Sequence, residues 1–152
     1  MLTIREDDMT EPQTLELLAL HLSGMHADSP KGNVFALDLS GLRVPEVTLW
    51  SAWSAGRIAS IGALKRLPDG NGEVKSMRTH PDFIRRGAAT AILDHIILTA
   101  RARQMRRLSL ETGSGSAFEP ALALYRAKGF RSGGPFGTYQ ANGFSQFLHL
   151  DL

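Results

Sequence analysis

The pattern of apolar and polar residues predicts several short strands in the middle of the chain. Residues 47–53 and 58–65 alternate in polarity and are rich in β-branched and aromatic side chains, and the turn SAGR lies between them. This pattern is typical of a β-hairpin. A second turn, LPDGNG, carries proline, aspartate and two glycines. We therefore expect the strand at 73–79 to pair antiparallel with the strand before it.

Apolar residues at helical spacing indicate four helices. Leucines recur at intervals of three and four residues after Pro12, which predicts an amphipathic helix with Thr10 as its N-cap. Gly24 and the polar segment that follows should end this helix, and Gly129 is well placed to stop the last one. We expect the helices at residues 11–24, 34–39, 88–103 and 120–128.

The remaining strand patterns complete a mixed sheet. Leu2–Arg5, 107–111 and 145–150 all have strand character. Because the helix at 88–103 connects the strands at 73–79 and 107–111, those two strands should be parallel, with a right-handed crossover. The order of elements predicts an α/β fold in which helices cover the faces of a mixed sheet.

The composition is that of a globular protein, and we expect one domain spanning residues 1–152. Hydrophobic residues make up 43% of the chain and charged residues 21%. Cysteine is absent, which excludes disulfides, thiolate metal sites and a cysteine nucleophile. The first residues lack an apolar signal core and no apolar run is long enough to span a bilayer. We therefore expect a cytoplasmic protein with no membrane partner.

Charged residues and histidines give no sign of nucleic-acid or metal binding. The formal net charge of +2 is small, and it suits an anionic small ligand equally well. A cluster of arginines at residues 101–107 has no interleaved aromatic residues, which favours a solvated face over a nucleic-acid site. The five histidines are scattered and lack a compact carboxylate partner, so we expect no metal.

The stretch from Glu73 to Leu93 has the pattern of an anion-binding strand, turn and helix. Pro81 ends the strand, and Gly87 permits a backbone conformation that a side chain would obstruct. The free N–H groups of the first helical turn, together with the helix dipole, favour an anion. Arg85 and Arg86 lie beside that helix end. The same pattern also fits an ordinary strand-to-helix connection with two solvated arginines.

Two motifs give the chain a family resemblance. Residues 77–93 read MRTHPDFIRRGAATAIL and residues 121–130 read ALALYRAKGF. At this separation they resemble the motifs of the GNAT superfamily of acyl-coenzyme A-dependent N-acyltransferases, and the resemblance spans nearly the whole chain. The segments SPKGNVFALDLSGL and GPFGTY are similar to those of a bacterial subfamily of small, mostly uncharacterised members. The resemblance implies a mixed, mostly antiparallel sheet of about six to seven strands with a parallel splayed pair, flanked by about four helices.

The resemblance also implies that acetyl-coenzyme A (acetyl-CoA) is the co-substrate and that no metal takes part. Ile84 stands where the family usually has Arg or Gln, and Phe118 replaces an asparagine. Since such a loop holds pyrophosphate mainly through main-chain N–H groups, nearby arginines can supply the missing charge. The implied CoA-binding residues are Met77, Arg78, Thr79, Arg85, Arg86, Gly87, Ala88, Ala89 and Thr90.

The implied reaction transfers an acetyl group from acetyl-CoA to a primary amine of an unknown acceptor, by direct attack in a ternary complex. Glu73 would take the amine proton, directly or through water, and Tyr125 would protonate the departing thiolate. A main-chain N–H at 77–79 would stabilise the oxyanion. A solvent-facing glutamate at the strand end and a packed helix tyrosine remain the structural alternatives for these two residues.

The acceptor site is expected to include His26, Trp50 and Tyr139. His26 follows the first predicted helix, and Tyr139 lies in a late loop. Trp50 and Trp53 are three apart on a strand and so lie on opposite faces, which allows at most one of them to line a cleft. The expected acceptor is a small-molecule or peptide amine, and a homodimer through the last strands is common in the superfamily.

A second function stays open at this point. The changes at Ile84 and Phe118 remove polar positions of the family and would suit a non-catalytic acyl-CoA-binding regulatory domain. The residues do not identify the acceptor or its preferred acyl chain.

Overall fold

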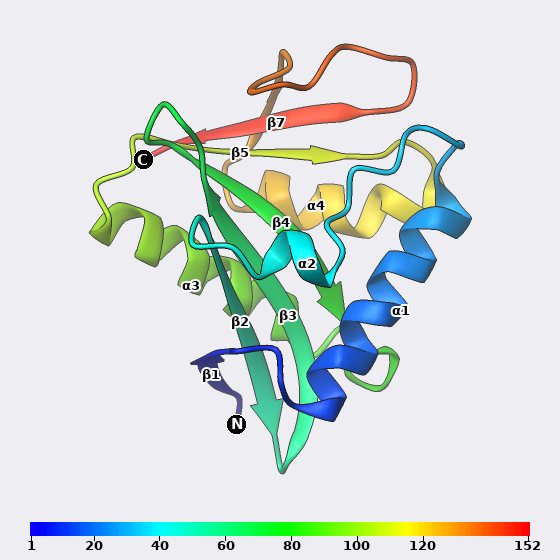
Figure 1. Cartoon of the computed structure of the whole chain (residues 1–152), viewed down its shortest axis with the longest axis vertical. Coiled ribbons are helices and arrows are strands. Elements are labelled where there is room, and N and C mark those ends of the chain that lie inside the picture. Colours follow the sequence, from blue (N-terminus) through cyan, green and yellow to red (C-terminus); the bar gives the residue numbers. More distant parts are fainter.

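A seven-stranded sheet in the order β1-β2-β3-β4-β5-β7-β6 forms the centre of the molecule (Figure 1). The computed structural model describes residues 1–152. The pair β4–β5 is parallel and every other pair is antiparallel, which confirms the predicted mixed sheet. The strands are β1 (Thr3–Glu6), β2 (Val47–Ser54), β3 (Arg57–Arg66), β4 (Gly72–Thr79), β5 (Arg107–Thr112), β6 (Arg131–Gly133) and β7 (Gln146–Asp151).

Four α-helices lie on the two faces of this sheet. The helices α1 and α2 lie on one face, here called the front, and α3 and α4 cover the back (Figure 1). None of these helices combines the length and apolar character needed to cross a membrane. Their bounds are α1 (Pro12–Asp28), α2 (Leu39–Leu42), α3 (Ala88–Ala102) and α4 (Glu119–Ala127).

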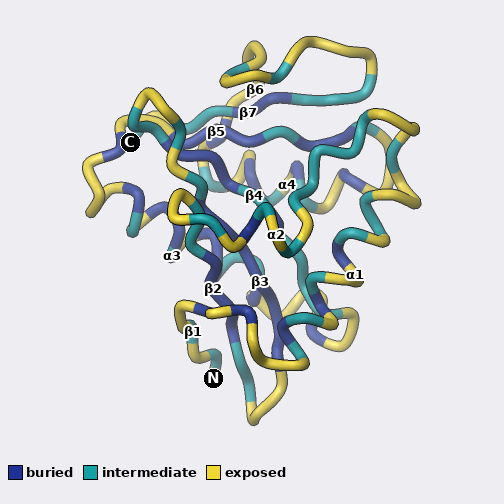
Figure 2. The backbone as a smooth tube through the Cα atoms, in the orientation of Figure 1, coloured by how far each residue is buried: buried dark blue, intermediate teal, exposed yellow.

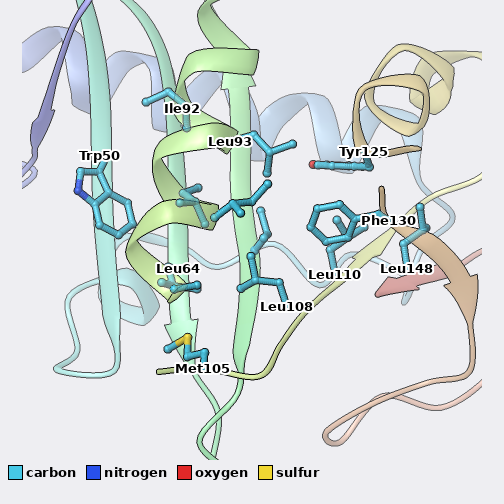
Figure 3. Packing of buried hydrophobic residues seen from close by; sticks show 14 of the residues in the cluster. Trp50, Leu64, Ile92, Leu93, Met105, Leu108, Leu110, Tyr125, Phe130 and Leu148 are labelled. Carbon is cyan, nitrogen blue, oxygen red and sulfur yellow. The ribbon is translucent and has the colours of Figure 1, made fainter. Parts of the chain in front are cut away.

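Two apolar cores pack against the opposite faces of the sheet. The larger one lies at the back, where Ile92 and Leu93 of α3 and Leu108 of β5 belong to one cluster of buried side chains (Figure 3). The smaller one lies at the front, where Leu17 of α1 packs with Ile61 of β3. Each fully buried side chain of this size contributes about 1.5–3 kcal/mol. In Figure 2 the buried positions accordingly follow the central strands, and exposed ones gather at turns and loops.

The front core does not extend over the whole sheet. Its members on the strands come from β2 and β3, and the main contacts of α1 and α2 are with β2, β3 and β4. The front of β5, β7 and β6 is bordered instead by loops, including the long loop between β6 and β7 (Figure 1). This leaves an open region on the sheet where polar side chains can reach solvent.

Three local predictions about the helices were wrong. Gly24 does not end α1, which continues to Asp28, and a Cβ at Gly24 would come within 2.8 Å of the Arg78 guanidinium. The glycine therefore lies inside the helix, beside the Arg78 side chain, and does not act as a stop. Thr10 does not cap α1, because its hydroxyl donates to Asp8 instead. The second helix begins at Leu39, where the Asp38 carboxylate accepts a bond from the Gly41 N–H.

The parallel pair separates soon after it begins. β4 and β5 are paired only at Gly72–Leu108 and at Glu73–Ser109. Beyond these residues the two strands diverge (Figure 1). A shift in the β3–β4 register accompanies the divergence, and Ser76 there has a left-handed φ of 57°. Such a bulge changes the direction of the strand. After Glu73 the main chain of β4 therefore has no hydrogen-bond partner on the side of β5.

Candidate active site

A cavity of about 570 Å³ opens where β4 and β5 separate. Residues from α1, the end of β4, the start of α3, β5 and α4 line this cavity. Arg86 is the predicted CoA-binding residue that does not line it, because its guanidinium lies 5.7 Å from the ring centre of Phe83. The predicted residues that do line it are Met77, Arg78, Thr79, Arg85, Gly87, Ala88, Ala89 and Thr90.

The turn before α3 has the backbone shape of an anion-binding loop. Arg85 and Gly87 both have left-handed φ angles, of 62° and 80°. A left-handed non-glycine residue such as Arg85 is strained by roughly 1–3 kcal/mol, and such strain gathers at ligand sites. No side chain caps the N-terminus of α3, and the space beside Gly87 where a Cβ would project is open. The first N–H groups of α3 are therefore free to bind an anion.

The two departures from the family pattern lie beside this cavity. Ile84 lines it and is 57% exposed. Phe118 also lines it and packs edge-to-face against Phe144 at 5.5 Å. Neither residue has a charged or hydrogen-bonding side chain, so an anion at this turn would have the main chain and Arg85 as its partners.

Tyr125 of α4 brings a hydroxyl to the same cavity. Its ring packs on Phe130 with 5.8 Å between ring centres, and the hydroxyl end points toward Leu93 of α3 (Figure 3). The hydroxyl has no hydrogen-bond partner in the protein, and burial raises the pKa of Tyr125 above its usual range. The Tyr125 hydroxyl is therefore protonated and free to donate a hydrogen bond to a ligand.

A larger cleft of about 2090 Å³ lies on the open part of the front face. It adjoins the smaller cavity, because Phe35 and Lys75 line both. Glu73, buried to 3% exposure, lies on its floor, and Tyr139 forms part of its wall. The predicted base and the predicted acid thus lie in two adjoining spaces at the separation of β4 and β5.

Glu73 is held by two partners through a single oxygen. The Tyr139 hydroxyl donates to Glu73 Oε2 at 2.5 Å, and Lys75 Nζ donates to the same oxygen at 3.1 Å. Lys75 also donates to the Tyr139 hydroxyl at 2.9 Å and to the Phe35 carbonyl at 3.3 Å. Burial, followed by the charge of Glu73, raises the pKa of Tyr139. Glu73 Oε1 accepts no hydrogen bond from the protein.

A second carboxylate, Glu111, lies across the separation on β5. It lines the smaller cavity, and its Oε2 accepts a bond of 2.7 Å from the Ser145 hydroxyl. Burial raises the pKa of Glu111 above the ordinary value. Sequence reasoning missed this residue, although its alternation with Ser109 along β5 places both on the front face.

His21 is a further residue that sequence reasoning missed. It lies on the buried side of α1, where its Nδ1 accepts a bond of 3.1 Å from Arg78 Nε. Its main-chain carbonyl also accepts a bond of 3.3 Å from Arg78 Nη2. Burial, followed by the charges of Arg78 and Lys75, lowers the pKa of His21 to about 4. The neutral imidazole therefore holds Arg78 in the cavity wall and ties α1 to β4.

Of the three predicted acceptor residues, the structure brings only Tyr139 to the cleft. His26 is exposed on α1 and lines neither space. Trp50 points to the back of the sheet and packs against His95 of α3 at 5.4 Å. Trp53 faces the front but lies under the Arg5 guanidinium at 4.2 Å. No group of three histidine or acidic side chains is arranged to hold a metal.

Comparisons with known proteins bear on the family and the fold of the chain. The family model described as "Acetyltransferase (GNAT) family" matches residues 8–130. The chain is 47% identical over 152 residues to the uncharacterized N-acetyltransferase YedL of Escherichia coli, covering 100% of this chain and 96% of that protein. It is 46% identical over 149 residues to the uncharacterized N-acetyltransferase YsnE of Bacillus subtilis, covering 98% and 99%. A Klebsiella pneumoniae crystal structure, provisionally described as an acyl-CoA N-acyltransferase, superposes with a TM-score of 0.84 at 27% identity, covering 100% and 98%.

Proposed function

The chain belongs to the GNAT family of acetyltransferases, and from that premise we propose that it acetylates a primary amine by direct attack within a ternary complex. Acetyl-CoA is the acetyl donor of this family. Glu73 is the proposed base and Tyr125 the proposed acid. The observation that carries the proposal is the pair of adjoining spaces at the separation of β4 and β5, one holding Glu73 and the other Tyr125. Two substrates can therefore meet at one point without a covalent enzyme intermediate.

The residues of the smaller cavity fit CoA. The uncapped N-terminus of α3 and the left-handed turn at Arg85 and Gly87 offer main-chain N–H groups to the pyrophosphate. The unpaired main chain of β4 at 77–79 offers donors and acceptors to the pantetheine arm and the thioester oxygen. The acetyl group would then lie between the strands, near Lys75, where the two spaces adjoin.

Glu73 is placed to take the proton that the acceptor amine loses. A protonated amine must become neutral before its lone pair can attack a carbonyl carbon. The free Oε1 of Glu73 can accept that proton, while Tyr139 and Lys75 keep the carboxylate oriented through Oε2. Glu111 offers a second carboxylate at the same place, so the assignment is tested below by separate substitutions.

Tyr125 is placed to donate a proton to the departing thiolate. The C–N bond forms as the C–S bond breaks, and the proton lost by the amine is balanced by one gained at sulfur. The raised pKa of Tyr125 keeps its proton in place at neutral pH. The same apolar surroundings would also raise the pKa of a thiol, which narrows the difference in pKa that opposes proton transfer from the tyrosine to the thiolate.

Two measurements test this function. Calorimetric titration with CoA should show binding, and substitution of Arg85 by glutamine should weaken it. Release of free thiol from acetyl-CoA should then depend on an added amine, drawn from small amines, amino acids and peptides. CoA binding without amine-dependent thiol release would contradict catalysis and leave only a binding role.

The proposed function also includes an acceptor class, a cellular location and an oligomeric state. The acceptor is a small-molecule or peptide amine, and the reaction takes place in the cytoplasm, with which a cysteine-free chain is compatible. A homodimer through β6 and β7 remains a prediction, which light scattering after gel filtration would check.

A further inference from the structure

Five polar residues lie directly opposite one another across five neighbouring strands. Lys65 of β3 is in register with Glu73 of β4, which is in register with Ser109 of β5. Ser109 is in turn opposite His149 of β7, and His149 is opposite Arg131 of β6. Residues in register on adjacent strands project from the same face of a sheet. We call these five residues the polar row, and all of them line the 2090 Å³ cleft.

The polar row lies on the front of the sheet, beyond the front core. On β3 the front-facing residues Ile61 and Ala63 pack under α1, and Lys65 is the next residue of the same face. On β5 the alternate residues Leu108 and Leu110 pack into the back core. The polar row therefore forms the floor of the cleft in the region that α1 and α2 leave open.

The middle of the polar row presents atoms that accept hydrogen bonds. His149 Nε2 lies 2.8 Å from the Gly134 carbonyl, which can only accept, so Nε2 carries a proton. In the neutral ring Nδ1 then accepts from the Ser109 hydroxyl at 2.7 Å. With its own proton engaged, Ser109 Oγ has lone pairs left for a donor. Glu73 Oε1 on the next strand is likewise free, so this pair of oxygens suits an amine, whose N–H groups donate.

The ends of the polar row present positive charge without a partner. Neither Lys65 nor Arg131 takes part in any ion pair of the structure. Arg66 and Arg106 line the same cleft and are also in no ion pair. Four acidic residues also line the cleft: Glu73 and Asp151 are paired with Lys75 and Arg107, whereas Glu46 and Asp69 are in no ion pair, so four unpaired cations stand against two unpaired carboxylates. The unpaired charge therefore favours an anionic ligand in the cleft.

We propose that the polar row binds an acceptor that carries a carboxylate in addition to its amine. The amine lies between Glu73 and Ser109, at the start of the β4–β5 separation, and the carboxylate lies at the Arg131 end. Arginine suits this end because its guanidinium binds carboxylates through two parallel hydrogen bonds. The inference rests on the proposed function, because it names the acceptor class for that same site.

The spacing of the strands limits the size of this acceptor. Neighbouring strands lie about 4.8 Å apart, so the backbones at Glu73 and Arg131 are separated by roughly 14 Å. The side chain of Arg131 spans part of that distance. The remaining gap suits an amine and a carboxylate that are several bonds apart, as in a dipeptide, better than the adjacent groups of a free α-amino acid.

The test compares probes that differ only in the carboxylate. Glycylglycine and glycylglycinamide are supplied as acceptors, and thiol release from acetyl-CoA is measured. A third probe, n-butylamine, is an amine that has neither a carboxylate nor a peptide bond. We expect kcat/KM to be about tenfold or more higher for glycylglycine than for its amide. Arg131→Gln should bring that ratio close to one. Arg101→Gln, which changes an exposed arginine outside the cleft, should leave it unaltered.

Each other outcome counts against the inference. Equal kcat/KM for the dipeptide and its amide, or a ratio that survives Arg131→Gln, would overturn it. Turnover of n-butylamine without turnover of the dipeptide would also overturn it but would leave the proposed function intact. Absence of thiol release with every amine would contradict the proposed function itself and the inference with it. Circular dichroism of Arg131→Gln establishes that the variant is folded.

Discussion

The hydroxyl of Tyr139 donates a hydrogen bond of 2.5 Å to Oε2 of Glu73, a residue 66 positions away in the chain. This contact joins the loop between β6 and β7 to the strand that carries the proposed base. It fixes one oxygen of the carboxylate and leaves the other free. The hydroxyl that orients Glu73 thus belongs to a residue that also lines the 2090 Å³ cleft.

Substitution of Glu73 by glutamine should abolish most of the activity. The change keeps the shape and the bond from Lys75 but removes the basic oxygen, so kcat/KM should fall about 10²- to 10⁴-fold. Glu111→Gln provides the matched control on the opposite strand and should have a much smaller effect. If the larger loss occurs in Glu111→Gln, the base has been assigned to the wrong carboxylate.

The two tyrosines should respond differently to loss of their hydroxyl groups. The chain has only Tyr125 and Tyr139. Tyr125→Phe removes a hydroxyl with no protein partner, so the free energy of unfolding should hardly change, while kcat falls about 10²-fold. Tyr139→Phe removes a hydroxyl bonded to Glu73 and Lys75 and should lower the free energy of unfolding by about 1 kcal/mol. Urea denaturation and steady-state kinetics measure both effects, and undiminished kcat in Tyr125→Phe would exclude it as the acid.

His21 should make the protein less stable as the pH falls. Its pKa is lowered from 6.5 to about 4 in the folded state. Between these two pH values the unfolded chain binds a proton at His21 that the folded chain does not bind. The free energy of unfolding is therefore fully present above pH 6.5 and decreases as the pH falls toward 4. The loss is on the order of 3 kcal/mol. Thermal melts from pH 4 to 8 should show a flatter dependence in His21→Asn than in the wild type, and an unchanged slope would refute the assignment.

A control for this experiment lies on the same helix. His26→Asn changes an exposed histidine that has no place in either cavity. Its melting temperatures should follow the pH dependence of the wild type.

Substitution of Gly87 by alanine should weaken both folding and CoA binding. The residue has a left-handed φ of 80°, which costs an alanine about 1–2 kcal/mol. The added methyl group would also occupy the open space beside the first turn of α3. Calorimetry should show a larger dissociation constant for CoA. Gly70→Ala is the control, since Gly70 has a similar φ of 86° but lies in the turn between β3 and β4. It should destabilise the fold without affecting CoA.

The shape of the turn before α3 could be predicted from the sequence because its features are local. A proline after a strand, a glycine before a helix and an uncapped first turn all lie within residues 79–90. The family motif adds Tyr125 at a fixed place on α4. These features depend on short-range backbone preferences, which the structure then reproduces at Arg85 and Gly87.

The acceptor side could not be predicted in the same way, because it depends on contacts between distant segments. The alternation of β2 separates Trp50 from Trp53 but does not say which face α3 covers, and the structure buries Trp50 there. His21 carries no pattern of its own, and its role follows only from the packing of α1 on Arg78. The partners of Glu73 likewise come from separate segments, and the polar row requires the register of five strands.

The most direct test of the central claim is the initial rate of thiol release when acetyl-CoA and an active amine are both varied. Attack within a ternary complex predicts double-reciprocal lines that intersect, no thiol release without amine, and near loss of the rate in Glu73→Gln. Parallel lines, or a burst of thiol in the absence of amine, would indicate an acetylated enzyme and would contradict the account.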